Sequence, residues 1–408
     1  GSWIFLLQTL ILLIITAIFL PGCGASAPAE DNAKAEVTSE YSLQVTAETA
    51  PAQLVDTETV AEAPEQAECG PEYFYFTKYS NTVTDEEGRS LLIENRCIPS
   101  FTSPDPERTA WVGEILDRLG RDYDAESANL REYAGEYVAE YGEELFYSYS
   151  NYQQLGVARH DDAVVSVISL SSLYSGGAHP NAVQVAYNLD IANCRQLVLE
   201  DIIEEKAAPE LARMVREGVD AKFAMIDGGN GLFEDYGDTI DNSMAYGNMT
   251  PYWYLNDTGL VIFYNQYELG PYAAGIIKVE LAYDALEGIL LEDYFPVAGD
   301  GIPGDLKVIE AGERGSRIPI TLDEQEGVLL IGVEGTVRQV QLSEVMWLED
   351  TPIAQDLRFS ALRLEENDVL EIYGGYCDET KSYVIEFTDG RGEHHLYHIR
   401  DGELMTER

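Results

Sequence analysis

The sequence has 408 residues, of which 45% are hydrophobic and 10% aromatic, so the chain can form two or three domains with sizeable cores. It carries 25 Lys and Arg against 73 Asp and Glu, a formal net charge of −48. A field of this sign repels nucleic acid and anionic lipid headgroups, which excludes nucleic acid as a partner, and it attracts basic proteins or cations. For any single acidic cluster, a solvated coat that aids solubility is the simpler interpretation.

An apolar run opens the chain, from Trp3 to Leu20, and leads into the segment LPGC at residues 20–23. A short apolar stretch that ends in small residues is typical of an export signal. The last four residues resemble a bacterial lipobox, in which the cysteine is lipidated. We therefore expect residues 1–22 to be a lipoprotein signal peptide and Cys23 to anchor the protein, through its lipid, on the outer face of the cytoplasmic membrane. An uncleaved membrane anchor is the alternative, because 18 residues are just long enough to span a bilayer.

The next segment, residues 23–68, is rich in Ala, Glu, Thr and Pro and holds almost no large apolar side chains. It cannot bury enough surface to fold, so it predicts a disordered acidic tether. Four cysteines follow Cys23, namely Cys69, Cys97, Cys194 and Cys377, and none has zinc-site spacing. An exported chain can form two disulfides from them, and Cys69 with Cys97 is the first candidate pair because both flank one predicted hairpin.

The folded part begins with a predicted hairpin. Aromatic residues alternate over residues 73–79, residues 85–88 supply a turn, and residues 89–99 return as a second strand. Two helices are expected next. The first starts at Pro106 and carries apolar residues at positions 111, 115 and 119, and the second carries an apolar stripe from Leu130 to Tyr141.

The stretch SLYSGGAHPN at residues 172–181 connects two predicted strands, residues 163–174 and 183–187. Two glycines supply positive φ angles and Pro180 restricts the exit, so the segment reads as a turn without any catalytic role. His179 on this turn either contacts a ligand or hydrogen-bonds within the turn. A lone histidine without a partner set favours the structural role.

Beyond this turn the pattern predicts a helix over residues 209–224, a loop over 227–251, and two strands that turn at residues 256–259. A third strand follows from residue 276. After residue 295 a Gly- and Pro-rich linker leads into short alternating segments over residues 304–408, which predict a small all-β sandwich or barrel.

The candidates for chemistry are few. His394 and His398 fall on one face of a predicted strand and are too far apart, at about 13 Å, to ligate one metal, and no nucleophile, zinc-protease, P-loop or EF-hand motif occurs. We expect no cofactor and no metal. Tyrosine is abundant, and Tyr264, Tyr267 and Tyr272 surround a Gly-Pro break. Such side chains suit either sheet packing or recognition of protein or sugar.

Two motifs together resemble the extracellular region of the RsiV family. The first is YSGGAH at residues 174–179 followed by YNLD at 187–190, and the second is LVIF at 260–263 followed by YELGPYAAG at 267–275. The resemblance implies a PdaC-type domain at residues 69–185 and an RsiV-type domain at 186–294. With the β-rich segment 295–408, whose role is unknown, the expected fold class is α+β, with antiparallel sheets and packed helices in two RsiV-like domains followed by a small all-β domain.

The resemblance also implies extracytoplasmic recognition, since the best understood relatives bind lysozyme outside the cell. We expect a non-enzymatic binding or sensing module whose ligand is a cationic protein such as lysozyme or a peptidoglycan glycan. The expected contact residues are Tyr174, His179, Tyr264, Tyr267 and Tyr272. The alternative is an accessory protein of a cell-wall hydrolase or deacetylase. His160-Asp161-Asp162 and the segment 394–398 lack the deacetylase motif contexts.

Overall fold

The computed structural model describes residues 71–142, 146–223, 231–297, 299–310, 315–323, 327–348, 351–400 and 402–406. The predicted signal peptide, Cys23, the tether and Cys69 lie outside these ranges. Residues Gly70–Arg408 form one compact unit with an α+β fold. No helix in the described ranges is both long and apolar enough to cross a membrane.

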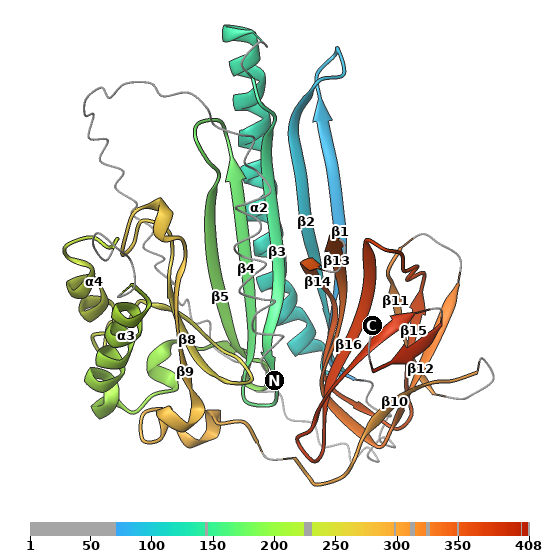
Figure 1. Ribbon diagram of the computed structural model, residues 1–408. Helices are drawn as coiled ribbons and strands as arrows, with labels where there is room; N and C mark the ends of the chain where they lie inside the picture. The colour runs from blue at the N-terminus through green and yellow to red at the C-terminus, as the bar shows by residue number, and fades with distance from the viewer. Residues whose placement is uncertain are drawn as a thin grey trace, which may run out of the picture. The chain divides into compact units, whose positions relative to one another are not determined.

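Most strands belong to one 11-stranded sheet, shown in Figure 1. All neighbours in it are antiparallel except β2 and β3. In spatial order the strands are β18 (Glu403–Met405), β17 (His394–Arg400), β16 (Lys381–Asp389), β13 (Thr336–Leu348), β14 (Thr351–Glu365), β1 (Tyr73–Thr84), β2 (Ser90–Thr102), β3 (Tyr149–His160), β4 (Val165–Tyr174), β5 (Asn181–Asp190) and β6 (Arg195–Gln196).

The predicted first hairpin is present as β1 and β2, and its alternating aromatic residues serve two different cores. Phe74 and Phe76 are fully buried against the core beneath helix α2. Tyr73 and Tyr75 point to the other face and pack against the core of the C-terminal sheets. Because side chains alternate along a strand, β1 joins the two cores.

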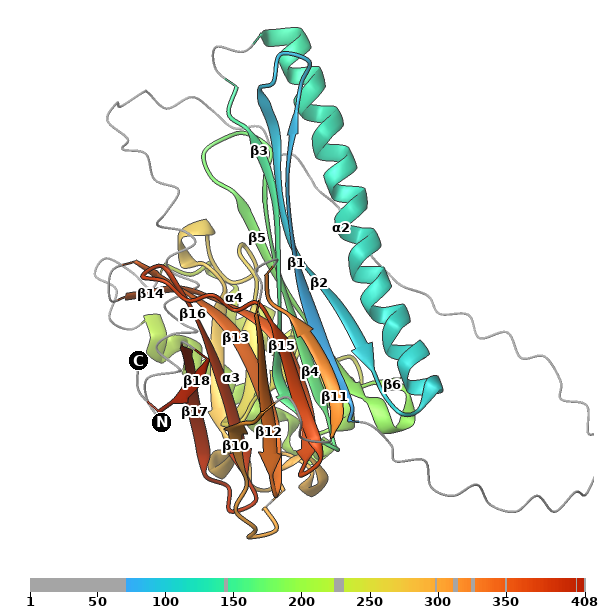
Figure 2. The same ribbon diagram turned by 90° about the vertical axis from the view of Figure 1, so that its right-hand side faces the viewer.

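Helix α2 (Pro106–Tyr141) connects β2 to the parallel strand β3, as a parallel pairing requires. Figure 2 shows it lying along the long strands. The prediction of two helices was wrong: one helix of 36 residues replaces them. Tyr123 and Ser127 are buried and continue the sheet-facing stripe between Leu119 and Leu130, so the polar middle segment stays helical.

A second layer packs on the other face of β3–β5. It is a three-stranded antiparallel sheet of β7 (Tyr252–Leu255), β8 (Gly259–Tyr264) and β9 (Ile277–Ala282). Every residue of β8 is buried, because Val261 and Phe263 face the large sheet while Leu260 and Ile262 face the helices. Those helices are α3 (Ala208–Phe223) and α4 (Tyr236–Ser243), and α4 lies inside the segment predicted as a loop.

The C-terminal segment forms a β-sandwich, as its pattern predicts. A four-stranded sheet packs on β13, β14 and β16 through one apolar cluster. Its strands, in spatial order, are β10 (Asp305–Val308), β12 (Val328–Glu334), β15 (Asp368–Tyr373) and β11 (Ser316–Thr321).

The sandwich shares a sheet with the N-terminal half, since β14 pairs with β1 through Phe359 opposite Tyr75. The expected boundary at residue 185 falls inside β5, whose pairing with β4 extends from Asn181 to Leu189. One continuous sheet therefore runs across both expected domain boundaries.

Candidate functional site

Two loops that are far apart in sequence carry the candidate site. The β4–β5 turn contains Gly176 and Gly177, with φ angles of 94° and 92° that suit glycine, as the sequence predicts. The β8–β9 loop, residues 265–276, contains the short 3₁₀ helix η4 (Tyr272–Ala274). These two loops present most of the polar and aromatic residues that the sequence singles out.

Amide side chains hold the β8–β9 loop against β5. Asn265 Oδ1 accepts a hydrogen bond from the Gln184 backbone N–H at 2.8 Å, and Asn265 Nδ2 donates to the Gln184 carbonyl at 3.0 Å. Gln266 Oε1 accepts from the Ala182 N–H at 3.0 Å. Asn265 and Gln266 thus act like an added strand. Their role was not predicted from the sequence, although a buried run that ends in two amide residues is a signal for it.

Three aromatic rings meet where the two loops meet, and we call His179, Tyr267 and Tyr272 the ring cluster. The imidazole of His179 stacks on the Tyr272 ring, with centroids 3.5 Å apart and planes at 16°. The rings of Tyr267 and Tyr272 lie 6.2 Å apart. His179 is exposed and Tyr267 is 53% exposed, so the cluster faces solvent.

Tyr267 has a left-handed backbone, with φ of 68°. This conformation costs an ordinary residue about 1 kcal/mol or more and is usually taken by Gly or Asn. Strained backbone of this kind is concentrated at binding sites and switch regions. A large exposed tyrosine held in such a position marks the loop as a candidate contact surface.

The other two expected contact residues lie differently. Tyr264 is 3% exposed and its hydroxyl is 3.0 Å from Ser243 Oγ, so it is a core residue on β8 that solvent does not reach. Burial raises its pKa to about 12. Tyr174 is half-buried, lies edge-on to Tyr149, and donates to the Gly177 carbonyl at 3.2 Å. Tyr174 supports the turn from one side.

The described part of the chain contains Cys97, Cys194 and Cys377, and no disulfide joins any two of these three residues. Cys97 is buried on β2, and burial raises the pKa of its thiol to about 12. Its expected partner, Cys69, lies outside the described residues, so that pairing remains a prediction.

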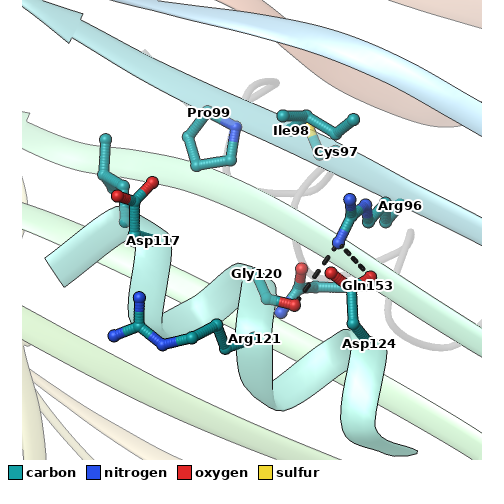
Figure 3. Close-up of a pocket in the computed structure, with 10 residues that line it drawn as sticks. Arg96, Cys97, Ile98, Pro99, Asp117, Gly120, Arg121, Asp124 and Gln153 are labelled. Carbon is teal, nitrogen blue, oxygen red and sulfur yellow. Dashed lines mark hydrogen bonds and ion pairs between the residues drawn. The ribbon is translucent and has the colours of Figure 1, made fainter. Parts of the chain in front are cut away.

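A cavity of about 290 Å³ lies between β2 and α2, drawn in Figure 3. Arg96 lies in it and is already engaged. Its Nη1 donates to Asp124 at 2.9 Å and to the Gly120 carbonyl at 3.4 Å. Its guanidinium also lies over the rings of Tyr79 and Tyr123, with distances of 5.5 and 5.0 Å to the centroids. Through these contacts Arg96 links α2 to the sheet.

His394 and His395 begin strand β17, which pairs with β16 in a hairpin. His394 Nε2 lies 3.3 Å from Glu386 Oε2, which raises the pKa of His394 above its ordinary value. His395, Asp389 and Glu393 could offer ligand atoms within 4.8 Å of one another. However, the Asp389 carboxylate already accepts from the Arg391 guanidinium and from the backbone N–H groups of Arg391 and Glu393. These hydrogen bonds account for the close approach of the three side chains as part of the turn between β16 and β17.

The described residues define an α+β protein with antiparallel-rich sheets that carries a solvent-facing ring cluster on two loops. Within it, residues 200–284 match the model of a family described as a protein of unknown function, DUF3298. The match includes Tyr267 and Tyr272, whereas the turn with His179 precedes it.

Among solved structures, a member of the DUF3298 family from Bacteroides fragilis is 20% identical, with a TM-score of 0.43, over 55% of this chain and 95% of that chain. A DUF3298 family protein from Pseudomonas aeruginosa is 18% identical, with a TM-score of 0.38, over 55% of this chain and 96% of that chain. No curated protein matches the sequence.

Proposed function

We propose that the protein is a lipid-anchored, RsiV-like binding module that holds a cationic protein of the cell envelope at the ring cluster. The observation that carries the proposal is the meeting of His179, Tyr267 and Tyr272 on two amide-tethered loops, with Tyr267 exposed in a strained backbone. Tyrosine and histidine rings give contact area at a low cost in conformational entropy. The net charge of −48 favours a basic ligand and speeds its encounter.

The same charge weighs against the anionic polymers of a cell wall and leaves a neutral glycan as the other ligand class. A glycan would gain ring contacts at the cluster but little from the electrostatic field. We therefore place the cationic protein first.

The proposal is tested by the binding of hen egg-white lysozyme, as a cationic probe, to the full chain in detergent. Replacing Tyr267→Gly relieves the left-handed strain while it raises the entropy of the unfolded chain, so the free energy of unfolding should change by less than about 1 kcal/mol. Combined with Tyr272→Ala, it should weaken binding about tenfold or more, as loss of a central aromatic contact does.

The matched control is Tyr376→Ala, which removes a 57% exposed tyrosine from the C-terminal segment. Binding should stay within about twofold of the parent. Succinylated lysozyme, which carries reversed charge, should not bind. Equal losses in the double variant and in the control would refute the ring cluster as the contact site.

The anchoring part of the proposal rests on Cys23. Metabolic labelling with a fatty-acid analogue should mark the parent chain and not a Cys23→Ser variant. Labelling of the Cys23→Ser variant would contradict the lipoprotein assignment, but it would not bear on the role of the ring cluster.

A further inference from the structure

The C-terminal end of α2 carries an exposed stripe of tyrosines. Tyr133, Tyr137 and Tyr141 are spaced four residues apart and therefore line one face of the helix over its last three turns. Tyr133 is 55% exposed and Tyr141 is 67% exposed. The buried stripe of α2 ends at Ala134, so these rings extend the apolar face of the helix into solvent. We call these three residues the tyrosine stripe.

Ring contacts hold two members of the stripe, Tyr137 and Tyr141, in place. The rings of Tyr137 and Tyr141 lie 5.1 Å apart, and Phe146 lies 5.8 Å from Tyr137. Phe146 in turn contacts Tyr149 of β3 at 5.2 Å. Because the rings support one another from the sheet outward, a partner would meet a surface that is already ordered, which reduces the entropy lost on binding.

Carboxylates run beside the tyrosines. Glu132, Glu136 and Glu140 have the same spacing, are all exposed, and make no ion pair with any described residue. Arg131 is the sole base between residues 130 and 142, and it is bound to the buried Glu94 at 2.6 Å. The stripe therefore lies beside an unneutralised row of negative charge.

This charge is unfavourable for the helix itself. The C-terminal end of a helix has a partial negative charge and is stabilised by Lys, Arg or His, yet α2 has no basic residue in its last turn and has Glu140 there. A departure from local stability without an evident compensating contact is typical of a functional surface. The excess of negative charge at this end of the helix attracts cations.

We infer that the C-terminal end of α2 is a docking surface for an arginine-bearing segment of a partner protein. A guanidinium stacks flat on a tyrosine ring and also forms paired hydrogen bonds with a carboxylate, and the alternating Tyr and Glu rows offer both to one strip of partner. The surface shares no residue with the ring cluster and does not depend on the function proposed for it. An arginine-bearing segment should be preferred to a lysine-bearing one, because the ammonium group lacks the planar face.

The inference is tested with fluorescein-labelled nona-arginine and nona-lysine peptides and the full chain in detergent. The triple change Glu132→Gln, Glu136→Gln and Glu140→Gln should weaken nona-arginine binding about tenfold, and Tyr133→Leu with Tyr141→Leu should weaken it about fivefold. The matched control is Glu114→Gln, Asp117→Asn and Asp122→Asn, which removes three exposed charges from the other half of α2. The control should stay within about twofold of the parent.

Equal weakening in the control would mean that only the net charge acts, and it would overturn the inference. So would unchanged binding in the tyrosine variant, or equal affinities for the two peptides. If the double tyrosine variant loses helical circular dichroism, the single change Tyr133→Leu gives the same readout, because this ring makes no aromatic contact within the described structure and is 55% exposed. The ring-cluster variant Tyr267→Gly with Tyr272→Ala should bind nona-arginine like the parent, which separates this surface from the proposed function.

Discussion

His160 is a fully buried imidazole whose neutral form the fold requires. Its Nδ1 lies 3.2 Å from Ser360 Oγ, its ring meets Phe74 edge-on, and its Nε2 is buried without a hydrogen-bond partner in the described structure. Burial lowers its pKa to about 3 from an ordinary value near 6.5. Protonation must therefore accompany unfolding at mildly acidic pH.

The sign follows from proton binding. Below pH 6.5 the unfolded chain binds a proton at this residue that the folded chain does not, so stability falls as pH falls from 6.5 toward 3. Between pH 7.5 and pH 5 the loss should be about 2 kcal/mol. Urea unfolding of the parent and of His160→Gln should show the variant gaining about that amount relative to the parent at pH 5. An equal difference between the two proteins at both pH values would contradict this role.

Arg96 and Arg121 line the same cavity and should respond differently to the same change. Arg96→Lys loses the guanidinium plane between two tyrosines and one of its two hydrogen bonds, so we expect a destabilisation of about 1–2 kcal/mol. Arg121 makes no polar contact within the described structure, and Arg121→Lys should change stability by less than about 0.5 kcal/mol. Thermal unfolding of the two variants provides the comparison. Similar shifts of the melting temperature would show that the contacts of Arg96 do not stabilise the packing of α2 on the sheet.

At the scale of single elements, α3 approaches β9 closely because of Gly218. A Cβ atom at Gly218 would overlap the side chain of Val279. Alanine is normally favoured over glycine inside a helix by about 1 kcal/mol, but here Gly218→Ala should destabilise the protein by about 1–3 kcal/mol through overpacking.

Gly113 provides the control, because it lies inside α2 and a Cβ there would have open space. Gly113→Ala should stabilise the protein by about 0.5–1 kcal/mol. Chemical denaturation of both variants should give shifts of opposite sign. A stabilising effect at both positions would show that α3 can move away from β9.

Most elements could be predicted from the sequence, because alternation and helical spacing record which face is buried. The hairpin at residues 73–99, the strands around the SLYSGGAHPN turn, and β7 with β8 follow from local pattern alone. The sequence could not predict that α2 is one helix instead of two. Tyr123 and Ser127 can be recognised as buried only when the sheet beneath them is known. For the same reason Tyr264 resembled an exposed residue, although the second sheet face of β8 buries it.

The site was predictable in part. Motif spacing identified His179, Tyr267 and Tyr272, and the fold brings these three together. Their meeting depends on Asn265 and Gln266 bonding to β5, a long-range contact that no local pattern contains.

At the scale of the whole molecule, a buried network of charged residues joins the N-terminal strand β1 to the C-terminal sandwich. Arg358 of β14 is 3% exposed, and it donates to the carbonyls of Phe76, Thr321 and Leu322 and to the Glu344 carboxylate at 3.1–3.2 Å. Lys78 of β1 also binds Glu344. The network therefore connects β1, β13, β14 and the four-stranded sheet.

Removing Arg358 should affect both halves together. Arg358→Met leaves a buried carboxylate and three carbonyl groups without this donor, and a loss of about 3–5 kcal/mol is expected. Arg363→Met removes a half-exposed arginine of the same strand, paired with Glu365, and should cost less than about 1 kcal/mol. Tryptophan fluorescence and far-UV circular dichroism should report one shared unfolding transition for the parent. Two separate transitions would show that the halves fold independently.

The position of β1 has a consequence for how the chain matures on the ribosome. This strand is among the first to be synthesised, but one of its two neighbours, β14, begins at Thr351. Until β14 has been synthesised, the free edge of β1 can hydrogen-bond with other chains, and its Tyr73 and Tyr75 rings have no core to enter. We therefore expect the nascent chain to be open to such pairing until β14 has emerged.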